Sequence, residues 1–211
     1  MDDTAISRPP RRRRKDARPA EIIDAGLREF AEKGFAGARL EDVARRAGIA
    51  KGTIFRYFAD KEALFLAAAR ARVVPVFDDA DAFVEAFAGS TRELLRLIVT
   101  QIYGRLVETD LRVLIRIVLA EGAIFPSLTE HYHREAIVRG RRLLDRIVAR
   151  GIARGEVRPG PAADLPIVIV APAIVASIWK MAFDRLDPIA TERFLAAHLD
   201  LVCEGLLVHG R

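Results

Sequence analysis

The feature that most constrains this chain is the stretch 40–64, LEDVARRAGIAKGTIFRYFADKEAL. Apolar residues recur at helical spacing up to Ala47, and Gly48 follows, so a short helix is predicted to end there. The next apolar pair, Ile54 and Phe58, is again one helical turn apart and predicts a second short helix of about eight residues. Two short helices joined by a tight turn indicate a helix-turn-helix.

The second helix is predicted to carry an outward face, because successive side chains on a helix turn by about 100°. Opposite the apolar pair lie Gly52, Thr53, Arg56 and Tyr57. Arginine reads guanine edges, threonine contacts the thymine methyl group, and glycine lets a backbone come close, so this face suits the major groove of DNA. Lys51 at the helix start could meet a phosphate. An ordinary helical hairpin with a solvated polar face is the alternative.

The run 22–64 resembles the DNA-binding domain of the TetR/AcrR family of bacterial repressors. Four segments carry the resemblance: AEKGF ends a first helix, EDVA lies in the second, KGTIFRYF corresponds to the recognition helix, and KEAL begins a fourth helix. The family usually has Thr or Ser at the start of the second helix, where this chain has Ala38 and Arg39, so the Arg39 guanidinium is expected to replace a hydroxyl at a phosphate. Ala50 stands where a capping Ser is common, and Phe55 where Tyr is frequent.

The positive charge of the chain is concentrated in one region. The net charge is +5, and residues 8–61 alone carry an excess of seven positive charges, whereas residues 62–211 are neutral overall. A basic region beside a neutral body is typical of a DNA-binding module, with a membrane-surface arm as the alternative. Tyr57 and Lys61 are expected near phosphates. Residues 1–18, with the run RRRRK, are predicted to be a disordered basic tail that adds affinity without sequence specificity.

The rest of the chain reads as helices, and no alternating strand pattern of useful length occurs. The expected fold is all-α, with a three-helix helix-turn-helix domain over 19–61 and a larger helical bundle over 62–211. Asp60 is the expected N-cap of the fourth helix, Pro75 its end, and 78–90 is either a short helix or a loop. Long helices are predicted over 91–108, 110–123, 127–155, 162–185 and 188–208.

The segment 165–179, LPIVIVAPAIVASIW, contains no charged residue and is therefore predicted to be buried on every side. It is too short, and has too many prolines, to favour a membrane span. The last helix offers two apolar faces, which indicates two packing partners. We therefore expect a homodimer, and the family resemblance implies an interface built from the last two helices. The predicted interface residues are Leu165, Ile169, Ile174, Leu195, Leu199, Val202 and Leu206.

A small-molecule site is expected between the helices of the bundle, a common location for ligands in helical proteins. The family resemblance also implies an effector pocket in this domain. Candidate contacts are the polar and aromatic residues of its helices, each of which could equally be a surface or core residue: Gln101, Tyr103, Arg112, Arg116, Phe125 and Trp179. The effector is expected to be apolar or amphipathic.

Catalysis and metal binding find little support in the sequence. His131 and His133 point to nearly opposite sides of a helix, so we predict no metal site and no cofactor. No nucleophile or glycine-rich phosphate loop is recognisable. The single Cys203 excludes an internal disulfide, and no segment of signal-peptide type precedes the basic run, so a cytoplasmic location is expected.

The leading interpretation is a DNA-binding transcriptional regulator, specifically a homodimeric repressor of bacterial type that a small molecule releases from double-stranded DNA. A DNA-binding dimer without an effector is one alternative. A helical enzyme with an accessory DNA-binding domain is the other.

Overall fold

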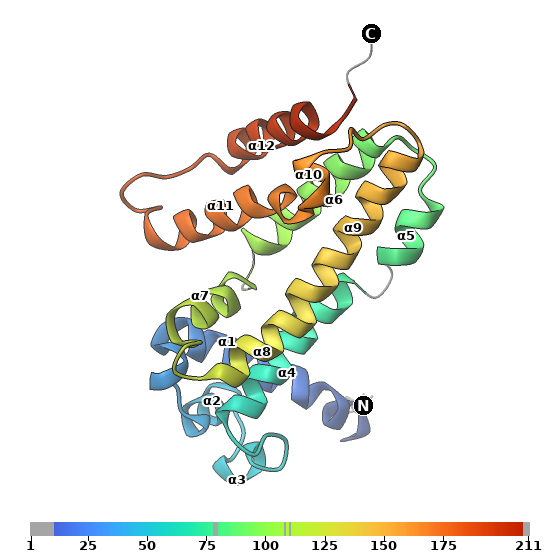
Figure 1. Cartoon of the computed structure of the whole chain (residues 1–211). Coiled ribbons are helices and arrows are strands. Elements are labelled where there is room, and N and C mark those ends of the chain that lie inside the picture. The colour runs from blue at the N-terminus through green and yellow to red at the C-terminus, as the bar shows by residue number, and fades with distance from the viewer. Residues whose placement is uncertain (1–10, 78–79, 108, 110, 209–211) are drawn as a thin grey trace, which may run out of the picture. The chain divides into compact units, whose positions relative to one another are not determined.

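The structure is a computed structural model that describes residues 11–77, 80–107, 109 and 111–208 (Figure 1). Its regular elements are helices, which confirms the all-α prediction. Within the described residues there is no strand, and Val157 and Leu207 form one isolated antiparallel bridge. The chain divides into two compact units, Met1–Ala68 and Ala69–Arg211, so the boundary lies inside the fourth helix rather than after residue 61.

The N-terminal unit contains α1 (Arg11–Gly37), α2 (Leu40–Arg46), α3 (Lys51–Ile54) and the first part of α4 (Lys61–Val73). Gly34 interrupts the helical backbone of α1 with φ 70° and ψ 178°, as its position at the end of the first helix predicts. The disordered tail predicted over 1–18 is corrected for residues 11–18, which belong to α1. Arginine, lysine and alanine, which dominate that segment, are good helix formers. Residues 1–10 lie outside the described residues.

Three phenylalanine rings form the centre of this unit. Phe65 of α4 meets Phe30 and Phe35 of α1 edge-on, with ring centroids 5.9 and 5.7 Å apart, a favourable geometry for aromatic pairs. All three side chains are fully buried. At Gly26, an added Cβ would lie 2.8 Å from a methyl carbon of Leu64, so the glycine leaves room for α4 to pack closely on α1.

The C-terminal unit continues from α4 through a series of helices that Figure 1 labels. They are η1 (Val74–Val76), α5 (Ala80–Ala86), α6 (Thr91–Leu106), α7 (Leu111–Glu121), α8 (Pro126–Tyr132), η2 (His133–Ile137), α9 (Val138–Ala153), α10 (Pro161–Asp164), η3 (Pro166–Ile169), α11 (Ala171–Ala182) and α12 (Thr191–Leu206). Helix α6 packs against α9, α11 and α12, and α11 and α12 lie side by side.

Several helices begin and end where the sequence predicts. The Asp60 carboxylate accepts a hydrogen bond of 2.7 Å from the Ala63 backbone N–H and so caps α4. Helix α4 ends before Pro75, and α5 occupies part of 78–90, which settles the choice between helix and loop. The predicted helix 127–155 is one helical run of α8, η2 and α9, in which η2 is a π-helical segment.

The helix predicted over 162–185 is not continuous. Proline lacks a backbone N–H and clashes with the preceding turn, and Pro166 and Pro172 accordingly divide the segment into α10, η3 and α11. Within the single chain, the segment 165–179 is not buried on every side. Ala173 is fully buried, whereas the side chains of Leu165 and Val175 are 54% and 51% exposed.

Candidate DNA-binding surface and ligand cavity

The helix-turn-helix has the predicted local geometry. Helix α2 ends at Arg46, Gly48 follows with φ +66°, and α3 begins at Lys51. Ile54 and Phe58 are 0% and 8% exposed and hold the second helix against the unit.

Helix α3 is shorter than the eight residues expected. Its α-helical part ends at Ile54, although the Tyr57 and Phe58 N–H groups still donate to the Ile54 carbonyl at 2.9 Å. Ala50, the N-cap, makes no side-chain hydrogen bond. A missing cap and a terminal turn that is not α-helical both weaken the helix. The recognition segment is therefore one α-helical turn followed by turns.

The four residues predicted on the outward face do lie on the surface side of this segment. Gly52 and Arg56 are exposed, and Thr53 and Tyr57 are half-buried. Phe55, which the sequence analysis placed only as a departure from the family, is 45% exposed beside them. An exposed aromatic ring next to an arginine adds apolar contact area of the kind that packs on thymine methyl groups.

Three further residues that the sequence predicts near phosphates, Arg39, Lys51 and Lys61, differ in their surroundings. Arg39 is exposed and precedes α2 as its N-cap residue. The Lys51 ammonium lies 3.0 Å from the Glu41 carboxylate, but both side chains are well exposed, and such surface pairs exchange at little cost. The Lys61 ammonium donates to the Phe35 and Ala36 carbonyls at 2.8 Å each, which leaves one of its three N–H groups for a phosphate. Lys61 therefore holds the end of α1.

A network of ion pairs fixes α2 against α1. Arg46 of α2 bonds to Glu29 and Glu32 of α1, and Lys33 bonds to Asp42 of α2 at 2.8 Å. Hydrogen bonds from Lys33, and then from Arg45, hold the pKa of Asp42 below its usual value. The orientation of the helix-turn-helix thus depends on charged groups that the sequence analysis did not single out.

The C-terminal unit contains an apolar cavity of about 850 Å³. Its walls come from the end of α4, α5, α6, α7, α8 with η2, α9, η3 and α11, and nearly all of the side chains that line it are aliphatic or aromatic. Pockets for drug-sized ligands typically have volumes of ~300–1,000 Å³ and apolar walls with a few polar groups. The cavity is therefore of the size and character of a small-molecule site.

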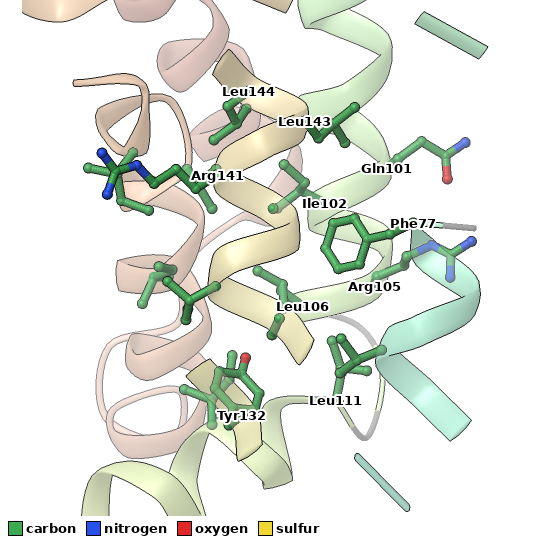
Figure 2. Close-up of a pocket in the computed structure, with 18 of the residues that line it drawn as sticks. Phe77, Gln101, Ile102, Arg105, Leu106, Leu111, Tyr132, Arg141, Leu143 and Leu144 are labelled. Carbon is green, nitrogen blue, oxygen red and sulfur yellow. The ribbon is translucent and has the colours of Figure 1, made fainter. Parts of the chain in front are cut away.

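The polar groups of the cavity lie around its edges. In Figure 2, Gln101 and Arg105 lie on one side beside Phe77, and Arg141 lies on the opposite side. Tyr132 directs its hydroxyl toward the interior, and burial raises the pKa of this phenol to about 12. Tyr132 is therefore a neutral hydrogen-bond donor at physiological pH. Among the described residues, no aspartate or glutamate lines this cavity.

Gln101 is the one predicted ligand contact that lines this cavity, and the other five do not line it. The Tyr103 hydroxyl lies 3.1 Å from Nδ1 of His198, whose Nε2 is 2.9 Å from the Ile169 carbonyl, so Tyr103 belongs to the core. Trp179 donates its indole N–H to the Asp187 carbonyl, and Arg112 donates to the Val107 carbonyl. Arg116 and Phe125 are not among the lining residues.

The residues predicted at the dimer interface divide between the core and the surface of the chain. Four of them are 1–9% exposed and belong to its core: Ile169, Leu199, Val202 and Leu206. Ile174 lines the cavity, and Leu195 packs against the core. Leu165 remains at the surface. The apolar side chains exposed on these last elements include Val168, Val175 and Leu201, at 43%, 51% and 67%.

Among the residues that the structure describes, no group of three or more His, Cys, Asp and Glu side chains is placed to hold a metal ion. No helix within those residues is long and apolar enough to cross a membrane.

Comparison with known families identifies both units. Residues 22–68 match the model of the bacterial regulatory proteins of the tetR family, and residues 87–201 match the model of the tetracyclin repressor-like C-terminal domain. The chain therefore belongs to the TetR family and is a DNA-binding transcriptional regulator.

Individual relatives match over nearly the whole chain. The fatty acid metabolism regulator protein of Bacillus subtilis (strain 168) is 24% identical over 198 residues, which cover 91% of this chain and 98% of that protein. The structure of the regulator FadR from Bacillus subtilis in complex with stearoyl-CoA superposes with a TM-score of 0.71 at 22% identity, over 90% of this chain and 99% of the other. A Saccharomonospora viridis regulator in complex with choline gives a TM-score of 0.75 at 20% identity, over 92% and 100%.

Proposed function

We propose that this regulator is a homodimeric repressor that releases its operator when an apolar or amphipathic small molecule occupies the cavity of the C-terminal unit. The cavity carries the proposal, because an effector-free dimerisation bundle has no need of about 850 Å³ of apolar space. The solved relatives support it, since two of them hold a small molecule. The relatives described above are regulators, and no observation favours the helical-enzyme alternative.

Helix α4 provides a route from the cavity to the DNA-binding unit. It begins directly after the recognition segment, continues across the boundary between the two units, and ends at Val73, which lines the cavity. A two-fold dimer must present its recognition helices about 34–36 Å apart to occupy successive major grooves. A ligand that displaces the end of α4 therefore changes DNA affinity, and a coupling of ~1–3 kcal/mol is sufficient.

The test uses reciprocity between the two sites. Native mass spectrometry of the purified protein identifies any retained small molecule, and that compound is then titrated with and without operator DNA. We expect operator DNA to weaken ligand binding by the same factor, about 5- to 150-fold, by which the ligand weakens operator binding. Equal ligand affinity in both titrations would favour the effector-free alternative.

Arg56 is expected to provide sequence specificity. Its side chain is exposed on the recognition segment, and an arginine that bonds both acceptors of a guanine discriminates by about 1–3 kcal/mol. Arg56→Ala should therefore reduce the ratio of operator to random-DNA affinity by about 5- to 150-fold. Lys51→Ala should weaken both affinities alike, because a phosphate contact carries no sequence information. An unchanged ratio in Arg56→Ala would exclude a base contact.

The homodimer is proposed to use the exposed apolar side chains of the last elements. Val175→Glu and Leu201→Glu each place a carboxylate on that surface without entering the core, so both should yield folded monomers in analytical ultracentrifugation. Ile124→Glu, at a 71% exposed position between α7 and α8, is the matched control and should remain dimeric. Dimers that persist in both test variants would place the interface elsewhere.

A further inference from the structure

The Tyr132 hydroxyl is a polar group that faces the interior of the apolar cavity. Tyr132 lines the cavity, and Figure 2 shows its hydroxyl directed inward. Among the described residues, no group forms a hydrogen bond with this hydroxyl, and burial alone raises its pKa. Buried hydroxyl groups in folded proteins are nearly always hydrogen-bonded, because an unpaired one costs free energy. The cavity therefore presents a donor whose partner the described part of the chain does not supply.

The backbone around Tyr132 places this residue in the wall. Tyr132 is the last residue of α8 and the N-cap of the π-helical segment η2. Ala136 and Ile137 of η2 line the same cavity, and so do Leu143 and Leu144 of α9. The wider turn of a π-helix changes the direction of the side chains before it relative to those after it, and such turns are frequent at functional sites. Segment η2 thus brings Tyr132 into the same wall as α9.

The cationic side chains that line the cavity lie at its rim. Within the described residues they are Arg105, His133 and Arg141, and all three are exposed. In Figure 2, the guanidinium groups of Arg105 and Arg141 point away from the interior, in opposite directions. An ionised ligand group beside the Tyr132 hydroxyl would leave water for apolar surroundings and a single neutral donor. Such a transfer costs much more than that of an uncharged polar group.

We propose that the effector is an uncharged, largely apolar molecule with a carbonyl oxygen that accepts a hydrogen bond from Tyr132. This inference rests on the proposed function and defines the chemical class of its ligand. A carbonyl oxygen uses the hydroxyl proton and brings none of its own, whereas a ligand hydroxyl would leave one of two protons without an acceptor. Tyr132 is the residue that determines specificity, and the apolar wall supplies affinity, up to about fourfold for each methylene transferred from water.

Four probes that share a phenyl ring and the same number of carbon atoms test this class. Valerophenone carries a ketone, pentylbenzene has no polar group, 5-phenylpentanoate carries a carboxylate, and 5-phenylpentylammonium carries a charged amine. Binding to the full chain is measured by isothermal titration with the protein in the syringe, which keeps each probe below its solubility limit. We expect valerophenone to bind about tenfold or more tighter than either charged probe.

Tyr132→Phe removes the hydroxyl and keeps the ring. It should weaken valerophenone binding by about fivefold or more, because the ketone oxygen then lies unpaired in apolar surroundings. Pentylbenzene makes no hydrogen bond, so its affinity should not fall. The thermal midpoint should stay at the parental value, since the hydroxyl has no partner to lose among the described residues.

Tyr103→Phe is the matched control. It removes a tyrosine hydroxyl from the same unit, but this hydroxyl bonds to His198 in the core and does not line the cavity. The ratio of valerophenone to pentylbenzene affinity should therefore stay at the parental value, while the thermal midpoint falls because a buried hydrogen bond is lost.

The outcomes separate this inference from the proposed function. The assigned ligand class is wrong if a charged probe binds the parent protein as tightly as valerophenone, or if Tyr132→Phe weakens valerophenone and pentylbenzene alike. Either result leaves the proposed function standing when the compound retained by the purified protein releases operator DNA. If valerophenone behaves as expected and operator affinity does not change, the assignment stands and the proposed release mechanism fails. Failure of all four probes to bind would overturn the assignment.

Discussion

Arg46→Ala is expected to destabilise the N-terminal unit and to abolish most operator binding. The Glu29 carboxylate that Arg46 contacts at 3.2 and 3.3 Å is almost completely buried. Removal of Arg46 takes away one of the two cations that compensate this buried carboxylate, and a buried charge without compensation is destabilising. Lys33 still pairs with Glu29, so part of the compensation remains. Hydrogen exchange of peptides from α2 and α3 should report the change.

The double variant Glu29→Gln/Arg46→Ala is the control for this prediction. It removes the buried charge together with its partner, so it should recover a large part of the lost stability and of the operator binding. Arg46→Ala with native exchange rates but no operator binding would indicate instead that Arg46 contacts DNA directly.

The helix-turn-helix could be predicted in detail because its signals are local. Gly48 and Gly34 mark sharp breaks in the backbone, and Ile54 and Phe58 are buried one turn apart. The length of α3 could not be predicted. Ile54 and Phe58 are one turn apart both in a longer α-helix and in a short α-helix followed by hydrogen-bonded turns, so their spacing does not distinguish the two.

The contacts of Lys61 and the residues that line the cavity depend on the tertiary fold. Lys61 lies at a surface position in the sequence pattern, yet the end of α1 supplies it with two carbonyl partners. The cavity residues come from segments between Val73 and Ile178, and no local pattern brings those segments together. Tyr132 was missed for this reason, although the adjacent π-helical segment η2 is of a kind that often occurs at functional sites.

The division of the last helices between core and interface could not be predicted, because apolar periodicity shows that a face is buried without showing what buries it. On α12, Leu199, Val202 and Leu206 pack into the core of their own subunit, whereas Leu201 points away from it. On the segment 165–179, two prolines break the helix and turn part of its apolar surface outward. A dimer remains our proposal, with a different set of residues.

Filling the large cavity is expected to remove the response to ligand while operator binding persists. Ile102 of α6 and Ile174 of α11 line the cavity and come from helices that are separate in sequence. An indole at either position occupies space that the ligand needs, so Ile102→Trp and Ile174→Trp should each weaken binding of the effector by about 100-fold or more. A clash of this kind costs at least several times the ~0.8 kcal/mol of one buried methylene.

The matched control for this last prediction is Ile152→Trp, at a position on α9 that is 41% exposed and outside the cavity. It should bind the ligand and release the operator as the parent protein does. The two cavity variants should bind operator DNA with parental affinity. They should also stay bound to it at ligand concentrations that release the parent protein, because a ligand that does not bind cannot shift the DNA-binding equilibrium. If both cavity variants still released operator at the parental ligand concentration, the effector would bind outside this cavity. If both variants lost operator binding without any ligand, the indole itself would favour the released state. Mutation of Val73 at the end of α4 should then also lower operator affinity.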